Sequence, residues 1–345
     1  MSIILGILLV GALIGCRFAR PGEFHRDYLS RESTIAVNGL FMIFVFLRHF
    51  LQYVSLDGVL DRAALILDNR LDQLVVITFL FYSGYGVVTS LLHKGRSYAL
   101  SLPKRALKVW LMFLGALLLY LILALCLGNE LTLSQVLLSL VAWDSVGNSN
   151  WYVWGVIWLY LLSFAAYAFF TEKPVVGTIL LTILTGVFII LMRFLKGSGS
   201  AYWYNTVFCY VLGAWYALFH EKLEGFLWKR DLHYILACVL AGILLVITYK
   251  LHQRSFLFYE AWVAVAIACV VLFTMKVRLY NPYLTFIGSH LFGFYILQRL
   301  PMIAFAHFMN MSAYVYPIFA ASFIISAGLA WLYHRYYMKL ISRIR

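Results

Sequence analysis

The chain alternates between long apolar runs and short polar connections. A helix needs roughly 17–25 predominantly apolar residues to cross a bilayer, and eleven runs reach or approach that length. Turn-forming and charged residues mark the connections, as at Arg20-Pro21-Gly22. We therefore predict membrane-spanning helices at 2–16, 34–54, 72–92, 107–127, 151–170, 175–193, 202–220, 233–249, 257–275, 283–306 and 312–334, the first of them short.

Composition narrows the class of protein. Of 345 residues, 64% are hydrophobic and 12% are charged, whereas a soluble domain carries about a quarter charged residues. This balance excludes an ordinary soluble enzyme and a disordered chain. The five cysteines fall singly in apolar stretches, which predicts neither a disulfide framework nor a metal site.

The basic residues are unevenly distributed over the connections. A formal net charge of +13 would suggest a nucleic-acid partner in a soluble protein. In a membrane protein the excess of Lys and Arg in cytoplasmic loops explains it without nucleic acid. With the N-terminus outside, nineteen basic residues lie on the inner side and six on the outer side, while Arg48 and Arg299 lie within spans. This ratio predicts a cytoplasmic C-terminus.

The fold class that follows is an all-α integral membrane protein of about eleven transmembrane helices. We divide it into an extra N-terminal anchor with its basic connection, residues 1–31, and a ten-helix domain, residues 32–345. Leu13-Ile14-Gly15-Cys16 looks like a lipoprotein cleavage box, but the basic residues follow the cysteine and do not precede it. An uncleaved anchor is the favoured interpretation.

The second predicted span carries two ionisable residues, Arg48 and His49, in its outer part. Ionisable groups in a span cost several kcal/mol unless they are paired or face a cavity, so each indicates a functional site. Imidazole is the usual general base near neutral pH, which makes His49 the catalytic candidate. Arg48 has an alternative interpretation, in which its side chain extends to the outer membrane surface.

Other spans place polar residues at the same outer level. We expect them to line one cavity with His49, with Arg299 and Glu260 in catalytic roles and four residues contacting substrate. Glu260 or Asp72 would orient the imidazole. The alternative is that some of them are interfacial anchors. The substrate candidates are Asn150, Trp151, Tyr295 and Gln298.

Two groups near the inner side are candidates for binding a cofactor. Lys104, Arg105 and Lys108 share one helical side by their spacing, and such a patch binds phosphates or anionic lipid headgroups, or only sets topology. Ser83, Gly84 and Tyr85 lie in the third span, where glycine permits backbone approach to a ligand or, more commonly, close helix packing.

Together these segments resemble the integral-membrane acyltransferase-3 family over residues 32–335. The helix Ile35 to His49 is similar to the family's first core helix, which ends in a catalytic histidine. The resemblance continues at Phe79 to Gly86, at Lys104-Arg105-x-x-Lys108, at Asn150-Trp151-Tyr152, and at Ile287 to His290 with Phe294 to Leu297. Two positions depart from the family pattern: Asn38 replaces an arginine, and Gln298 replaces a histidine.

The resemblance implies an O-acyltransferase in a bacterial plasma membrane. The donor would be cytoplasmic acyl-coenzyme A, with acetyl-coenzyme A favoured, and the acceptor a hydroxyl of an extracytoplasmic glycan. His49 would act as the general base or carry the acyl group. Arg48 or Arg299 would stabilise the oxyanion, and the basic patch would hold the phosphates of the donor. The bundle itself or a separate extracytoplasmic transferase would complete the transfer.

A transporter or flippase for a lipid-linked sugar or small solute is the alternative function. It would also place polar groups in a cavity within the membrane, surrounded by lipid. Transporters of this kind often have internal repeats with broken half-helices in matching positions, and the sequence contains neither feature. This difference favours the enzyme.

Overall fold

The computed structural model describes residues 1–56 and 58–343, and almost all of its regular structure is helical. The first half contains α1 (Ser2–Leu13), β1 (Arg17–Phe18), α2 (Arg31–Leu51), α3 (Arg62–Leu71), α4 (Ile77–Lys94), α5 (Arg96–Cys126), α6 (Leu133–Leu140) and α7 (Trp151–Tyr167). The second half contains α8 (Pro174–Lys196), α9 (Phe208–Leu227), α10 (Asp231–Leu251), α11 (Phe256–Lys276), β2 (Val277–Arg278), α12 (Pro282–Ser289), α13 (Leu291–Leu297), α14 (Arg299–Phe308), α15 (Val315–Tyr333) and α16 (Lys339–Ser342). Short 3₁₀ segments are η1 (Val59–Asp61), η2 (Asp72–Val76) and η3 (Ser198–Trp203), and η4 (His334–Met338) is a π-helix.

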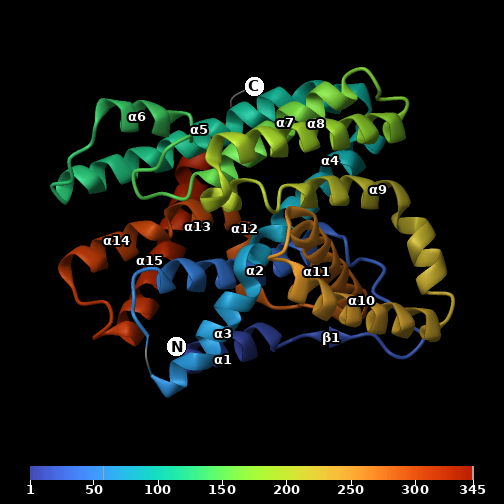
Figure 1. Cartoon of the computed structure of the whole chain (residues 1–345), viewed down its shortest axis with the longest axis horizontal. Helices are drawn as coiled ribbons and strands as arrows, with labels where there is room; N and C mark the ends of the chain where they lie inside the picture. Colours follow the sequence, from blue (N-terminus) through green and yellow to red (C-terminus); the bar gives the residue numbers. More distant parts are fainter. Residues whose placement is uncertain (57, 344–345) are drawn as a thin grey trace.

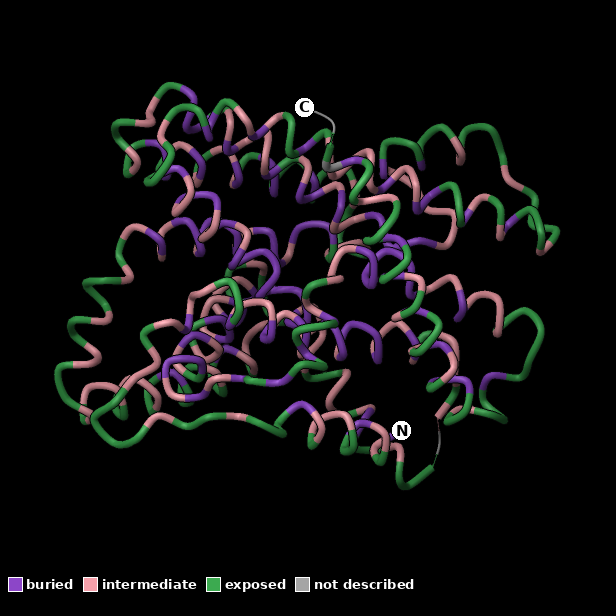
Figure 2. The backbone as a smooth tube through the Cα atoms, turned by 180° about the vertical axis from the view of Figure 1, so that it is seen from behind, coloured by how far each residue is buried: buried purple, intermediate pink, exposed green. Residues whose placement is uncertain are grey.

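The helices form one bundle with α2 and α4 at its centre (Figure 1). Helices α5, α7 and α8 lie side by side along one edge, and α10 packs beside α11 at another. Buried positions gather on the faces that look into the bundle (Figure 2). The outward face of α10 exposes apolar residues such as Ile235, Val239 and Ile243. A soluble protein would bury such a surface, so it is suited to contact with lipid.

Eight helical segments of the described chain are long and apolar enough to cross a membrane. The predicted helical membrane architecture is therefore confirmed. Helices α1 and α7 are shorter apolar helices, and α9 carries Glu221, Lys222 and Glu224 near its end. The count of eleven spans and the cytoplasmic position of the C-terminus stay predictions, as does the division into two domains.

Contacts between connections respect the predicted sidedness. On the predicted inner side, β1 pairs antiparallel with β2, and Arg278 forms an ion pair with Asp27 at 2.6 Å. On the predicted outer side, the backbone N–H of Ser55 donates to the Ser312 hydroxyl at 2.9 Å. Each of these contacts therefore joins two connections that the charge distribution places on the same side of the membrane.

The predicted span at 283–306 is not one helix. It is broken at His290, whose φ of −107° and ψ of 20° are not helical, and its hydrogen-bond pattern is interrupted again at Gln298, where the dihedral angles stay helical. Pro301 follows the second break and has no N–H to donate to the carbonyl of Leu297. Side chains from other helices bind carbonyls around this break, including Tyr120, whose hydroxyl donates to the Ile296 oxygen at 2.8 Å. Such bonds let an interrupted helix persist inside a membrane protein.

Two helix pairs approach so closely that only glycine fits between them. A Cβ atom at Gly84 of α4 would collide with the Tyr210 carbonyl oxygen of α9, and one at Gly213 of α9 would collide with the Phe81 carbonyl oxygen of α4. Helices α2 and α12 repeat this arrangement. Small residues at such interfaces let backbones pack directly against each other, which is how membrane helices associate without a hydrophobic driving force.

Gly84→Ala is predicted to destabilise the bundle, because the added methyl group meets backbone that cannot move aside. Overpacking of this kind costs about 1–3 kcal/mol. Thermal unfolding in detergent, followed by the loss of the monodisperse gel-filtration peak, should give a lower midpoint than the wild type. The matched control is Gly86→Ala on the same helix, where no atom lies within 4 Å of the added Cβ. Equal midpoints for the two variants would contradict the packing role.

Candidate functional site

A polar cavity of about 390 Å³ opens among the helix ends that the charge distribution places on the outer side. Its walls come from the last turn of α2, from η2, from the connection before α7, and from α13 and α14. The residues that line it are Val45, Arg48, His49, Gln52, Gln73, Val75, Val76, Ser145, Asn148, Ser149, Asn150, Trp151, Tyr202, Tyr295 and Arg299. The predicted convergence of polar residues from distant spans therefore has a geometric counterpart.

His49 lies in the last turn of α2. Ser30 begins this helix, because its hydroxyl accepts the Ser33 N–H at 3.2 Å as an N-cap. The imidazole lies beside the Tyr295 ring, with 6.2 Å between the ring centroids. Its Nδ1 atom is buried and has no hydrogen-bond partner in the described structure. A buried ring nitrogen without a partner costs free energy, so a bound molecule that pairs with it would be favoured.

Arg48 is held by carboxylates on the other side of the cavity. Its guanidinium donates to Asp68 Oδ1 at 3.2 Å and to Asp72 Oδ1 at 2.8 Å. The second oxygen of Asp72 accepts the Tyr259 hydroxyl at 3.0 Å. Asp72 also has a φ of 40°, a strained conformation for a residue with a side chain, and these bonds help to hold it there. The positive charge of Arg48 is therefore compensated before any substrate binds.

Arg299 differs from Arg48 because no acidic residue in the described chain forms an ion pair with it. Its guanidinium contacts the Gln52 side-chain oxygen and lies 5.8 Å from the centroid of the Tyr53 ring. Its Nε atom is buried without a partner. Burial raises the pKa of the Tyr53 phenol, and the nearby Arg299 charge acts in the opposite direction. The positive charge of Arg299 is therefore available to an anionic ligand in the cavity.

The four residues predicted to contact substrate have different surroundings. Trp151 and Tyr295 line the cavity, and the Tyr295 hydroxyl is buried without a partner. Asn150 also reaches the wall, but its amide braces the loop by donating to the Ala142 oxygen at 2.9 Å and to the Asp144 oxygen at 2.8 Å. Gln298 is fully buried and is not among the lining residues.

Neither carboxylate proposed to orient the imidazole forms a hydrogen bond with it in the described structure. Both oxygens of Asp72 are used by Arg48 and Tyr259. Glu260 does not line the cavity, and its Oε1 atom is buried without a partner. The neighbours of the imidazole are the Tyr295 ring and the Gln298 side chain, and not a carboxylate.

The inner candidates lie away from this cavity. Helix α5 begins at Arg96, well before the predicted start, so Pro103 and the basic patch lie within the helix. Lys104 and Arg105 are exposed, and the Arg105 guanidinium lies 4.6 Å from the centroid of the Tyr98 ring. The three cofactor candidates in α4 lie at or next to the packing contact between α4 and α9. Gly84 is the contact with α9 described above, Tyr85 packs against Tyr216 and His220 of α9, and Ser83 precedes them.

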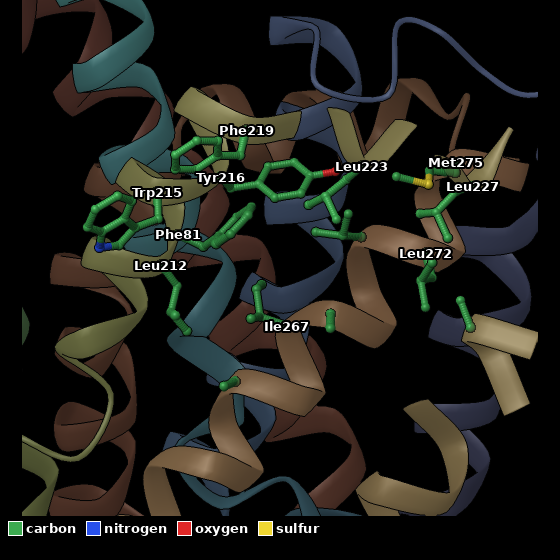
Figure 3. A pocket seen from close by; sticks show the side chains of 14 residues that line it. Phe81, Leu212, Trp215, Tyr216, Phe219, Leu223, Leu227, Ile267, Leu272 and Met275 are labelled. Atoms are coloured by element: carbon green, nitrogen blue, oxygen red, sulfur yellow. The ribbon is translucent and has the colours of Figure 1, made fainter. Parts of the chain in front are cut away.

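A second cavity, of about 460 Å³, lies between α4, α9, α10 and α11 and is almost entirely apolar (Figure 3). The labelled side chains that line it include Phe81, Leu212, Trp215, Ile267 and Met275 (Figure 3). Its lining includes no acid or base that could exchange a proton near neutral pH. The polar cavity around His49 is therefore the candidate active site.

Several cavity residues were not found by the sequence reasoning. Gln52 follows α2, Ser145 and Asn148 belong to the connection before α7, and Tyr202 lies in η3. Polar residues in connections are expected to be solvated, so nothing in the sequence distinguished these from others. No group of three or more His, Cys, Asp or Glu residues in the described ranges could hold a metal ion.

Comparison with known proteins gives a family. No curated protein and no solved structure matches the chain. The family model described as the acyltransferase domain of the acyltransferase-3 type matches residues 36–335, which include His49 and every residue that lines the polar cavity. Since this match covers most of the sequence, the chain belongs to the acyltransferase-3 family.

Proposed function

We propose that this membrane acyltransferase moves an acyl group from cytoplasmic acyl-coenzyme A to a hydroxyl of an extracytoplasmic glycan, with an acetyl group favoured. The observation that carries the proposal is the shared cavity of His49 and Arg299 in a chain of this family. A hydroxyl acceptor requires a base, and attack on a thioester creates an oxyanion that requires a positive charge or hydrogen-bond donors. The cavity offers both.

His49 would act as the general base. It takes the proton of the acceptor hydroxyl while that oxygen attacks the thioester carbonyl carbon. The intermediate then collapses, the carbon–sulfur bond breaks, and the imidazolium returns the proton to the departing thiolate. In the alternative order the imidazole itself attacks the thioester carbon, the carbon–sulfur bond breaks and coenzyme A leaves with the imidazole proton. The acceptor hydroxyl then attacks the acyl-imidazole, the carbon–nitrogen bond breaks, and the hydroxyl proton returns to the ring. The buried Nδ1 has no hydrogen-bond partner, which supports a role in which the substrate supplies that partner.

Arg299 is the better candidate than Arg48 for stabilising the oxyanion. Two carboxylates already compensate Arg48, so its field in the cavity is reduced. Arg299 forms no ion pair in the described chain and has a buried, unpartnered Nε. A preorganised cation is most effective at a site shielded from water. Arg48 would instead have a structural role: through Asp68 and Asp72 it would hold the part of the cavity wall that lies next to His49.

The donor would bind from the inner side. Lys104, Arg105 and Lys108 form a cationic helical face that suits the phosphates of coenzyme A. The pantetheine arm would pass between helices towards His49, along the side of α4 that contains Ser83 and Tyr85. This placement is supported by the separation of the basic face of α5 from the polar cavity, which lies among the outer helix ends.

The acceptor would enter the polar cavity from outside. Trp151 and Tyr295 offer rings and a hydroxyl to a sugar, while Asn150 and Gln298 would maintain the walls around it. The protein would work in a bacterial plasma membrane, either delivering the acyl group itself or passing it to a separate extracytoplasmic transferase. Solute flux in proteoliposomes without any consumption of acetyl-coenzyme A would instead favour a transporter or flippase.

His49→Ala is predicted to lower the rate of acyl transfer by about 10²–10⁴-fold, the usual contribution of a general base, and by more if the imidazole carries the acyl group. Release of free coenzyme A from labelled acetyl-coenzyme A measures the rate in purified protein. His307→Ala removes an exposed histidine of α14 and serves as the control with unchanged activity. Full turnover in the His49 variant would show that the histidine is structural.

Arg299→Gln and Arg48→Gln are predicted to fail in different ways. Loss of Arg299 should lower kcat by about 10²–10³-fold with little change in thermal stability, because its charge acts on the transition state. Loss of Arg48 should lower the unfolding midpoint, because Asp68 and Asp72 are left unpaired. Arg254→Gln, at an exposed arginine, is the control for both measurements. A normal kcat in Arg299→Gln would reject the oxyanion role.

The double variant Lys104→Gln with Arg105→Gln is predicted to raise KM for acetyl-coenzyme A by about twofold to tenfold without lowering kcat. The difference from the wild type should shrink at high salt, which screens exposed charges. Lys222→Gln with Lys229→Gln removes the same charge from the same predicted side and should leave KM unchanged. If both double variants behaved alike, the patch would set topology only.

A further inference from the structure

A third cavity, of about 610 Å³, lies where the end of α15 meets α5 and the break between α12 and α13. It shares no lining residue with the His49 cavity. The residues that line it are Met112, His290, Trp331, His334, Arg335, Met338 and Lys339. This pocket belongs to neither the proposed catalytic centre nor the basic patch on α5.

The wall of this pocket is built by a π-helical segment, η4 (His334–Met338), which continues α15. A π turn bonds residues five apart, is rare, and occurs frequently at functional sites. Two tyrosines fix the segment to α5: the Tyr333 hydroxyl donates to the Met112 oxygen, and the Tyr337 hydroxyl donates to the Leu111 oxygen at 2.8 Å. The widened turn is therefore held in place and presents its polar side chains to one cavity.

The charge of the lining is positive. It contains Arg335 and Lys339, and it contains no carboxylate. In the part of the chain that is described, Arg335 forms no ion pair with an acidic residue. Its guanidinium instead lies 5.1 Å from the centroid of the Trp331 ring and 5.8 Å from that of the Tyr336 ring. A guanidinium held over an aromatic ring is well placed to bind a phosphate.

Two histidines also line the pocket. The rings of His290 and His334 lie 5.0 Å apart between centroids and come from different helices. The His290 Nδ1 pairs with the Phe286 oxygen at 2.8 Å; since a carbonyl only accepts, Nδ1 carries the proton and Nε2 is left for another partner. Met112, Met338 and Trp331 supply the apolar remainder of the wall.

We propose that this pocket binds a phosphate group on the inner side of the membrane. The phosphate belongs either to an anionic phospholipid headgroup or to the nucleotide part of coenzyme A. Cations, imidazoles and a tryptophan next to methionines suit both, because each ligand joins a phosphate to an apolar or aromatic group. Phosphate binding does not depend on the proposed function; only the coenzyme A source rests on it.

The test measures binding to the full-length protein in a neutral detergent, with no acyl transfer required. Two probes separate the sources: dioctanoyl phosphatidylglycerol for the headgroup and adenosine 3′,5′-bisphosphate for the nucleotide. The wild type should bind at least one of them. Arg335→Gln with Lys339→Gln should weaken that binding by about tenfold or more, the scale of one lost charge-assisted hydrogen bond.

The control is Lys229→Gln with Arg343→Gln, which removes the same charge from exposed residues outside the pocket and should change Kd by less than about twofold. His290→Gln is a milder variant that should weaken binding by a smaller factor. It keeps the test decisive if the double variant is not monodisperse. Failure of the wild type to bind either probe, or equal weakening in control and pocket variants, would overturn the proposal. Binding without any acyl transfer would reject the proposed function alone.

Discussion

Direct backbone contact between two pairs of helices is the constraint on which the other features depend. Gly84 and Gly213 join α4 to α9, and Gly39 and Gly288 join α2 to α12, each glycine facing a carbonyl oxygen of its partner helix. The two helices of each pair cannot slide along each other without a collision between backbone atoms. The axial position of α2 relative to α12 is therefore fixed. His49 on α2 consequently meets the residues that follow α12 at a defined height.

The break between α12 and α13 is the second feature that determines the site. While α12 remains packed on α2, the non-helical residue His290 redirects the chain. The redirected segment brings Tyr295 and Arg299 to the cavity of His49, while His290 lines the pocket beside η4. One interrupted helix thus contributes to both polar sites, at different depths of the bundle.

Charge compensation distinguishes the guanidinium groups of the bundle. Arg48 is paired with two carboxylates and so contributes to structure, whereas Arg299 and Arg335 form no ion pair with an acidic residue in the described ranges. An unpaired guanidinium at a cavity wall favours an anionic ligand, because the ligand supplies the compensation that the protein lacks. On the proposals made above, the two sites would bind different anions: a transient oxyanion at Arg299 and a stable phosphate at Arg335.

The sequence by itself determined the membrane class, most of the helices, the family resemblance and the candidacy of His49, since hydrophobic run length and an ionisable residue within a span are local properties. It also placed Arg299 and Tyr295 near the right level. Only the tertiary structure decided that Asp72 pairs with Arg48, that Glu260 lies outside the cavity, and that polar residues of the 141–150 connection belong to its wall. Those outcomes depend on helix rotation and on contacts between distant segments, which periodicity along a single chain does not specify.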